Sequence, residues 1–200
     1  TNTDGSITST VRANPTAGFS IVSYTGTGAN ATVGHGLNAP IGMFIIKNRD
    51  EVKNWVVGHS ALATGNSLRL NLTNAVDTAA TIFNSTDPTS SVFSVGTNVS
   101  VSGSGDNIIA YCFAPVDGYS SMGSYVGNGS SDGPMVYTGM RPKWIMYKET
   151  TNNGSGHWNV YDSDGCIDVS KAAYNQDEKD WMSYVLCPCC GEGRIWGDAV

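Results

Sequence analysis

Charge is scarce in this sequence. Asp, Glu, Lys and Arg make up 14% of its 200 residues, against roughly 25% in an average soluble domain. The 11 Lys and Arg residues form no basic cluster and the net charge is −6, so the positive surface that binds a phosphate backbone is missing. No apolar run approaches the ~18 residues of a membrane span. These absences argue against nucleic acid as a partner and against membrane insertion.

Leucine is also scarce. The chain has 6 Leu but 18 Val and 11 Ile, and Gly, Ser, Thr and Asn fill 81 of the 200 positions. Branching at Cβ suits a pleated sheet better than a helix, and the small polar residues are those of turns and neutral surfaces. The composition therefore predicts an all-β chain, long enough for one ordinary domain or two small ones.

Short apolar segments separated by turn residues run along most of the sequence. Their number and spacing predict a β-sandwich or jelly-roll-like fold. The segment 107–114 is nearly all apolar, which indicates a central strand buried on both faces. Residues 168–185 contain the one predicted helix, with Ser170 as its N-cap. The predicted strands are 19–24, 42–48, 54–58, 67–72, 80–83, 91–95, 107–114, 122–126, 134–138, 143–148 and 157–161.

An internal repeat organises the chain. Gly18-Phe19-Ser20 recurs as Gly118-Tyr119-Ser120, and the later matches keep an offset near one hundred residues. Such self-similarity is typical of a duplicated unit. We therefore predict an extended N-terminal segment at 1–17, a first copy at 18–116, a second copy at 117–185 and a cysteine-containing tail at 186–200.

Two tryptophans hold matching places in these copies. Trp55 follows the apolar run Phe44–Lys47, and Trp158 follows its counterpart Ile145–Lys148. Their symmetry predicts that both are core anchors. The second copy contains no evident match to 83–114, which predicts that it is truncated and that the first unit or another chain completes its sheet.

The residues from Thr16 to about Tyr161 resemble a family of virion proteins found in tailed phages of marine bacteria and cyanobacteria, in which a Gly/Ser/Thr-rich β domain occurs in tail-fibre-like proteins. The resemblance is carried by three shorter stretches and by one long block. These are AGFSIVSYTGTGANATVGHGL (17–37), Phe44–Lys47 with NWVV (54–57), FNSTDPTSSVFSVG (83–96) and AYCFAPVDGYSSMGSYVGNGSSDGPMVYTGMRPKWIMYK (110–148).

This resemblance implies a structural, non-enzymatic role in a tailed-phage virion, as a tail fibre or its attachment protein, with assembly in the host cytoplasm. It implies other virion proteins as partners and a homo-oligomer, which in fibres is typically a trimer. A capsid cement or decoration protein and a module that binds host surface glycans are the alternatives. It implies no catalytic residues and no cofactor.

Chemistry-bearing residues are few. Nucleophilic catalysis needs Ser or Cys with His and an orienting carboxylate, and no motif spacing places His35 or His59 in such a set. Cys187, Cys189 and Cys190 are weak candidates for a zinc site, because the C-P-C-C spacing is not that of paired zinc ligands. Reduced thiols are the favoured interpretation, since disulfides are rare in a cytoplasm.

Two further clusters have an ordinary and a functional interpretation. Asp162, Asp164 and Asp168 could converge on calcium but lack the remaining ligands of a complete loop, so a simple Asp/Gly turn is favoured. Trp144 and Tyr147 could stack on a sugar ring, because a flat aromatic face matches the C–H face of a pyranose.

Overall fold

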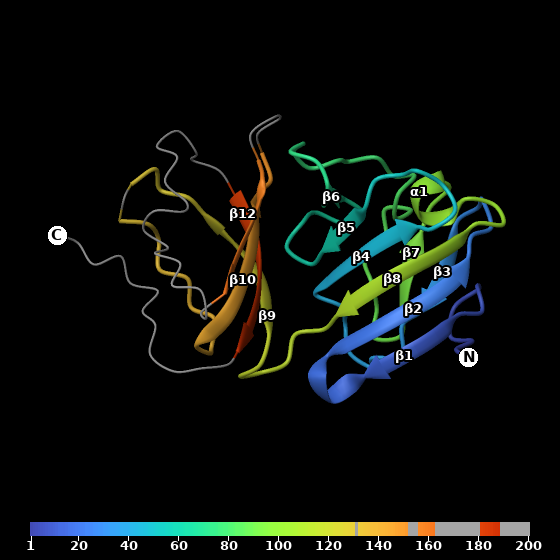
Figure 1. Ribbon diagram of the computed structural model, residues 1–200, viewed down its shortest axis with the longest axis horizontal. Coiled ribbons are helices and arrows are strands. Elements are labelled where there is room, and N and C mark those ends of the chain that lie inside the picture. The colour runs from blue at the N-terminus through green and yellow to red at the C-terminus, as the bar shows by residue number, and fades with distance from the viewer. Residues whose placement is uncertain (131, 152–155, 163–180, 189–200) are drawn as a thin grey trace.

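The computed structural model describes residues 1–130, 132–151 and 156–162, together with the backbone of 181–188. Within these residues the secondary structure is almost entirely antiparallel strand, so the predicted all-β class is confirmed. Figure 1 shows two sheets that lie against one another, one built from the N-terminal part of the chain and the other from the C-terminal part.

The first sheet has six strands in the order β1-β2-β8-β4-β5-β6, and every pair is antiparallel. A short 3₁₀ turn, Pro15–Ala17, joins β1 to β2. The strands are β1 (Thr10–Asn14), β2 (Phe19–Thr25), β4 (Met43–Asn48), β5 (Val56–His59), β6 (Leu68–Arg69) and β8 (Asn107–Phe113). The ordered sheet thus begins within the predicted N-terminal segment, ahead of Gly18.

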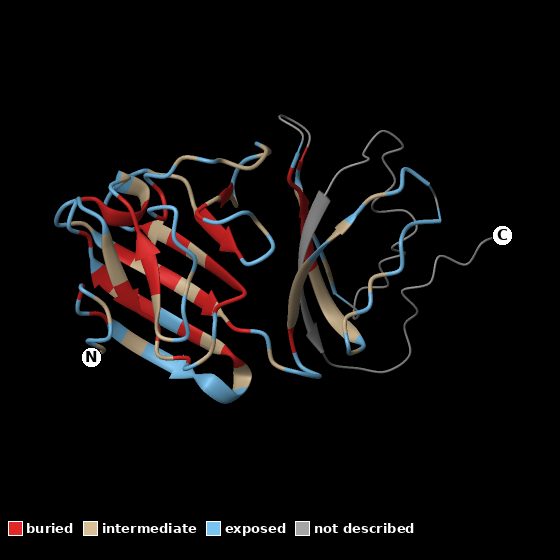
Figure 2. Ribbon diagram, turned by 180° about the vertical axis from the view of Figure 1, so that it is seen from behind, coloured by how far each residue is buried: buried red, intermediate tan, exposed pale blue. Residues whose placement is uncertain are grey.

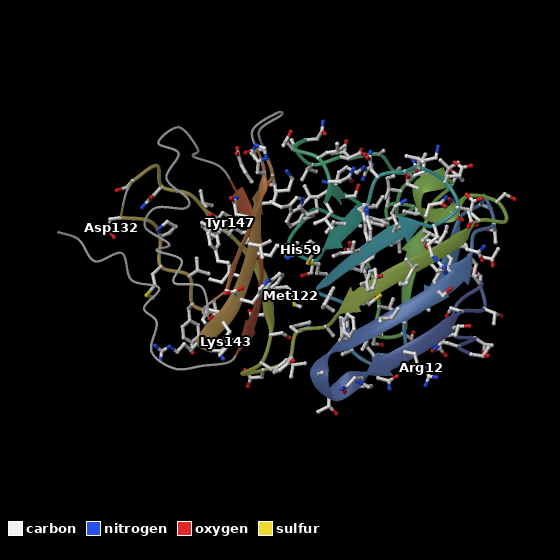
Figure 3. All side chains as sticks on the ribbon, viewed as in Figure 1. Arg12, His59, Met122, Asp132, Lys143 and Tyr147 are labelled. Carbon is white, nitrogen blue, oxygen red and sulfur yellow. The ribbon has the colours of Figure 1, made fainter. Side chains whose placement is uncertain are left out.

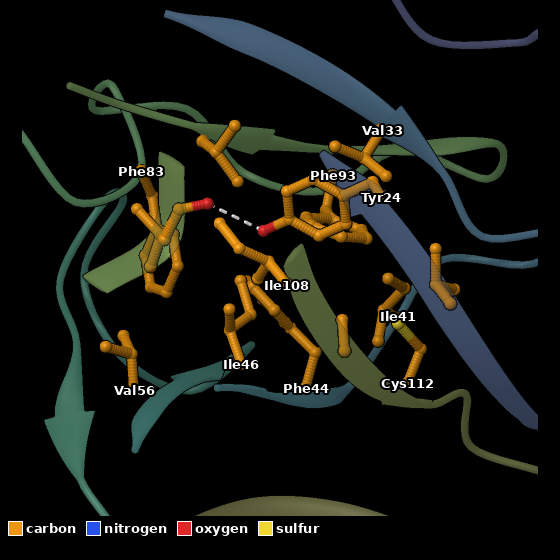
Figure 4. Close-up of a cluster of buried hydrophobic side chains, with 14 of the residues drawn as sticks. Tyr24, Val33, Ile41, Phe44, Ile46, Val56, Phe83, Phe93, Ile108 and Cys112 are labelled. Atoms are coloured by element: carbon orange, nitrogen blue, oxygen red, sulfur yellow. Dashed lines mark hydrogen bonds between the residues drawn. The ribbon is translucent and has the colours of Figure 1, made fainter. Parts of the chain in front are cut away.

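The main hydrophobic core lies on one face of this sheet. Ile108, Ala110 and Cys112 of β8 are fully buried against it, while Ile109, Tyr111 and Phe113 are half-buried on the opposite face and Asn107 is exposed. The predicted central position of the strand is confirmed, but only one of its faces is fully buried. Figure 4 shows the aromatic and branched side chains that fill this core.

A second layer covers the core. The strands β3 (Ala31–Gly34) and β7 (Val92–Val95) pair with each other, and the one-turn helix α1 (Val99–Ser102) follows them. Phe93 and Val101 contribute fully buried side chains to the core. Among the described residues, no helix is long and apolar enough to cross a membrane.

The second sheet has four strands in the order β11-β10-β12-β9, all antiparallel. They are β9 (Ser121–Val126), β10 (Pro142–Glu149), β11 (Trp158–Asp162) and β12 (Trp181–Pro188). The predicted helix 168–185 is therefore wrong over 181–185, where the chain is a strand between β9 and β10. Its residues 168–180 lie outside the described part of the chain.

The two sheets pack through a smaller hydrophobic cluster. Met43, Val57 and Leu68 of the first sheet contact a face of the second sheet that includes Met146. They come close at Gly42, where an added Cβ would lie 2.9 Å from the sulfur of Met122. Figure 2 shows that burial is densest in the first sheet and its covering layer. The chain is thus a layered all-β structure. Its first unit is the first sheet with the covering layer, and its second unit is the second sheet with its loops.

Corresponding strands of the predicted repeat hold corresponding places in the two sheets. The order β2-β8-β4-β5 in the first sheet matches β9-β12-β10-β11 in the second. The register agrees as well. In the first sheet Ile45 pairs with Tyr111 and Val57. In the second sheet its repeat counterpart, Met146, pairs with Val185 and Val160. This agreement supports the predicted duplication, which stays a prediction.

β12 also bears on the predicted truncation of the second copy. It occupies the place that β8 holds in the first sheet, and it runs to Pro188, past the predicted boundary at 185. The second sheet thus has its own fourth strand. The two copies differ in the length of the segment that precedes this strand. It has 18 residues between β11 and β12 (163–180) and 47 residues between β5 and β8 (60–106).

Some predicted strands differ from the observed ones. The segment 67–72 is reduced to the two-residue strand β6, 80–83 forms a turn, and 134–138 has no strand. Ile82 and Phe83 are nevertheless almost fully buried. Their apolar character therefore reflects burial in the covering layer rather than pairing in a sheet.

Candidate functional site

A buried lysine lies where the two sheets meet. Lys148 on β10 has no exposed surface, and its ammonium donates hydrogen bonds to the carbonyl oxygens of Gly156 and of Leu72, the latter at 3.4 Å. Its Nζ lies 6.0 Å from the centre of the Trp158 ring. Burial lowers the pKa of Lys148, and the carboxylate of Glu149 acts in the opposite direction.

Neighbouring groups extend this polar contact between the sheets. The indole of Trp158 donates to the carbonyl oxygen of Arg69 at 2.9 Å, and the Arg69 guanidinium pairs with Asp77 at 2.5 Å. The amide of Val76 donates to the carbonyl oxygen of Thr150 at 2.9 Å. Most of these bonds end on main-chain carbonyls, so the cluster fixes how the sheets dock rather than presenting a reactive group.

A cavity of about 180 Å³ opens beside the end of β5. Polar side chains in its lining are already bonded to the surrounding loops. Nδ1 of His59 accepts a hydrogen bond from the Ala61 amide at 3.0 Å. The Asp87 carboxylate accepts one from the Thr64 hydroxyl at 2.7 Å. The cavity is lined by Pro40, Ile41, Phe44, Gly58, His59, Ser60, Ala63, Gly65, Asn66, Phe83, Thr86, Asp87 and Pro88. It has the size for a few water molecules rather than for a drug-sized ligand.

His35 lies in the core of the first unit. Its Nε2 lies 3.2 Å from the carbonyl oxygen of Thr89, and its Nδ1 accepts a hydrogen bond from the Leu37 amide at 3.3 Å. Burial lowers its pKa, which the Thr89 bond and the charge of Asp4 oppose. His35 thus closes a turn, and the structure does not bring it together with His59.

The two residues predicted to stack on a sugar lie on opposite faces of β10. Trp144 packs against the cluster between the sheets, whereas Tyr147 is 7% exposed and stacks on Tyr161 at 5.8 Å. Figure 3 shows Tyr147 on the side of β10 away from the first sheet and Met122 on the side facing it. The structure therefore does not assemble Trp144 and Tyr147 into one platform.

The predicted core anchors differ from each other. Trp158 packs against the cluster between the sheets and is half-buried. Trp55 is also half-buried, just ahead of β5, where its amide donates to the side chain of Asn71 at 3.0 Å. The repeat thus gives both tryptophans matching positions in the chain, but only Trp158 lies at the contact between the sheets.

The weak metal candidates fall mostly outside the described residues. Asp162 ends β11 and is exposed, Cys187 belongs to β12, and the other four lie outside the described ranges. Those four are Asp164, Asp168, Cys189 and Cys190. In the described part of the chain, no group of three or more His, Cys, Asp or Glu side chains is placed to hold a metal ion.

Cys112 is a buried free thiol in the main core. Burial raises the pKa of Cys112 to about 12, and the nearby Ser20 side chain acts in the opposite direction. A thiol of this kind is a small apolar side chain at neutral pH, because the nucleophilic form is the thiolate.

Exposed apolar side chains are a feature that sequence reasoning missed. In the described residues they occur in both units. The second unit has Met135 (79% exposed), Tyr137 (85%) and Val160 (51%), with Val126 and Tyr119 less exposed, and the first unit has Val52 (103%), with Val99, Leu72 and Ile21 less exposed. An exposed apolar side chain is stabilised when a partner covers it. The pattern of apolar residues alone could not reveal it, since the same residues also fit buried strands.

Together, the fold and these contacts define an all-β protein of two packed antiparallel sheets whose polar interior groups mainly bond to the main chain. A family described as a domain of unknown function, DUF7483, matches residues 1–181. The chain therefore belongs to this family, and the match includes strands of both sheets. Neither a curated protein nor a solved structure matches the chain.

Proposed function

We propose that this protein is a non-enzymatic structural component of a tailed-phage virion, in a tail fibre or its attachment. The resemblance of 110–148 to virion proteins suggests the particle. The observation that carries the role is the exposure of two apolar side chains on the segment between β9 and β10, Met135 (79%) and Tyr137 (85%). Such side chains lose water most favourably when a partner covers them.

The surface chemistry also supports assembly. With 14% charged residues, contacts between copies or with other virion proteins desolvate few charges, and burying an unpaired charge is the costliest event at an interface. We propose that the chain forms a homo-oligomer and binds other virion proteins. A trimer is the stoichiometry that the fibre resemblance implies.

The proposal is tested on intact particles of the phage that carries this gene. Mass spectrometry of purified virions is expected to find the chain at a fixed copy number, and antibodies raised against it are expected to label the tail. Label distributed over the head at capsid symmetry positions would instead identify a cement protein. Absence of the chain from purified virions would contradict a virion role.

A glycan-binding module is a second candidate, favoured by one observation. Tyr137 is 85% exposed on a segment that also contains the exposed residues Asn128 and Asp132. An aromatic ring can stack on the apolar face of a sugar, and amides and carboxylates can bond to its hydroxyls. A glycan array separates the two candidates. Specific binding that Tyr137→Ala abolishes would favour the receptor role, and Tyr119→Ala, which removes another exposed tyrosine, is the matched control.

A further inference from the structure

The edges of the two main sheets are not equally protected against pairing with another chain. A free strand edge is a template for intermolecular pairing, and proteins protect such edges by shortness, charge or proline. β1 carries Arg12 and is followed by Pro15, β6 has two residues, and β11 ends in Asp162. Each of these edges has at least one such protection.

β9 is the exception. Its six residues, Ser121–Val126, include no charge and no proline, and they pair with β12 in continuous register without a bulge. In the described part of the chain β9 ends the strand order of its sheet. Ser124 and Val126 are exposed, Val126 by 45%. β9 thus has the length, flatness and neutrality of a strand that accepts a partner.

The first sheet shows what such a strand accepts. Ile21 of β2 and Met122 of β9 hold the same place in their sheets. Ile21 pairs with Tyr111 of β8, and Met122 pairs with Val185, which holds the equivalent position in β12. The other edge of β2 is covered by β1, which pairs with it antiparallel over five residues. The fold therefore already binds an antiparallel strand at the position that β9 leaves without one in the described residues.

We propose that β9 pairs antiparallel with β9 of a second copy of this chain across a two-fold axis. This inference deepens the proposed function by naming a contact through which copies assemble. A second copy fits because β9 is uncharged and two such strands meet without like-charge repulsion, even in a chain with a net charge of −6. Each copy also keeps its own strands, so nothing needs to unfold.

The alternation of the strand limits the register, and the exposure of Ser124 and Val126 selects one of those that remain. A two-fold axis perpendicular to the sheet keeps each face on its own side, so paired residues must lie on the same face. An axis through Ser124 places Met122 opposite Val126 and Gly123 opposite Tyr125. This register covers the exposed Val126 with an apolar partner and puts the exposed Ser124 opposite itself.

In this register Ser124 of one copy lies opposite Ser124 of the other, which allows a direct test. Ser124→Lys and Ser124→Asp each place like charges directly opposite one another, which destabilises a cross-strand pair. Each variant is expected to raise the dissociation constant of the pair at least about a hundredfold. An equimolar mixture of the two variants brings Lys opposite Asp and is expected to restore association as a heterodimer. Ala13→Lys, an exposed position on the β1 edge, is the matched control and keeps the wild-type mass.

The readout is molar mass by light scattering across a concentration series, with thermal unfolding to confirm that each variant is folded. Wild-type protein is expected as a dimer, or as a hexamer if a separate surface forms the trimer that the fibre resemblance implies. A wild-type monomer or trimer, or a dimer that both variants leave intact, would overturn the β9 contact. Because the assay uses purified chain alone, its failure leaves the particle experiment to decide the proposed function.

Discussion

At the scale of single residues, buried polar side chains in this protein bond mainly to the backbone. The Tyr24 hydroxyl donates to the carbonyl oxygen of Val101 at 2.7 Å inside the core (Figure 4), and burial raises the pKa of Tyr24 well above its usual value. This bond ties β2 to the covering layer through α1. The core is therefore held by specific contacts as well as by apolar packing.

Tyr24→Phe removes that hydroxyl and leaves the buried Val101 carbonyl without its hydrogen-bond donor. The free energy of unfolding is expected to fall by about 1–3 kcal/mol, measured by urea denaturation. Tyr119→Phe changes a tyrosine that is 44% exposed and is expected to leave stability within about 0.5 kcal/mol. Equal stability of Tyr24→Phe and wild type would show that the bond contributes nothing.

Lys148 gives a pH-dependent prediction. Its pKa is lower in the folded state than in the unfolded chain because burial disfavours the charge, so the unfolded state binds more protons between the two values. The contribution of Lys148 to stability therefore rises with pH as the pH passes through the lowered pKa toward about 10.4. Lys148→Met removes this dependence.

The Lys148→Met variant no longer buries a charge, but it loses the hydrogen bonds to the carbonyl oxygens of Gly156 and Leu72, so the prediction concerns how its stability relative to wild type changes with pH. That relative stability should fall as the pH rises toward about 10. Lys53→Met, at a partly exposed lysine paired with Glu51 on the surface, should show no such trend. A difference between wild type and Lys148→Met that stays constant over this range would contradict the buried-charge explanation.

At the scale of elements, β1 shows how a sheet edge is completed. It pairs with β2 over five residues, and Ile7 just ahead of it is 7% exposed in the core. Deleting residues 1–14 uncovers the β2 edge and removes Ile7 from the core. The expected result is a loss of at least about 2 kcal/mol in unfolding free energy and a larger aggregated fraction. An unchanged urea midpoint and unchanged solubility would contradict it.

Sequence patterns predicted the elements that depend on local composition. The apolar runs at β2, β4, β8 and β10 predicted strands close to their observed bounds, because branched apolar residues in a short run have few other arrangements. β3 was missed, since in Ala31–Gly34 only Val33 carries a large apolar side chain. β12 was partly read as helix because its pairing with β9 and β10 is set by residues far away in the chain.

The site residues were less predictable for a similar reason. The repeat placed Trp55 and Trp158 at matching positions, yet contact between the sheets depends on which face meets which. Alternation puts Trp144 and Tyr147 on opposite faces of β10, and this could have been inferred from their odd spacing alone. The exposure of Tyr137 and Met135 follows from tertiary packing, which the order of residues does not specify.

At the scale of the whole molecule, the two sheets pack through equivalent faces. The cluster between them includes Met43 and Ile45 from the first sheet and their repeat counterparts Trp144 and Met146 from the second. The other face of the first sheet is covered by β3, β7 and α1. In the predicted duplication, this contact between the sheets is the internal counterpart of a contact between two subunits.

We expect copies of this protein to associate with one another through their folded surfaces. The molar mass of the purified protein by light scattering, with and without reductant, tests this association. An oligomer with the same mass in both conditions is expected, because the proposed contacts are strand edges and apolar side chains rather than disulfides. A monomer at all concentrations, or an oligomer that reductant dissociates, would contradict it.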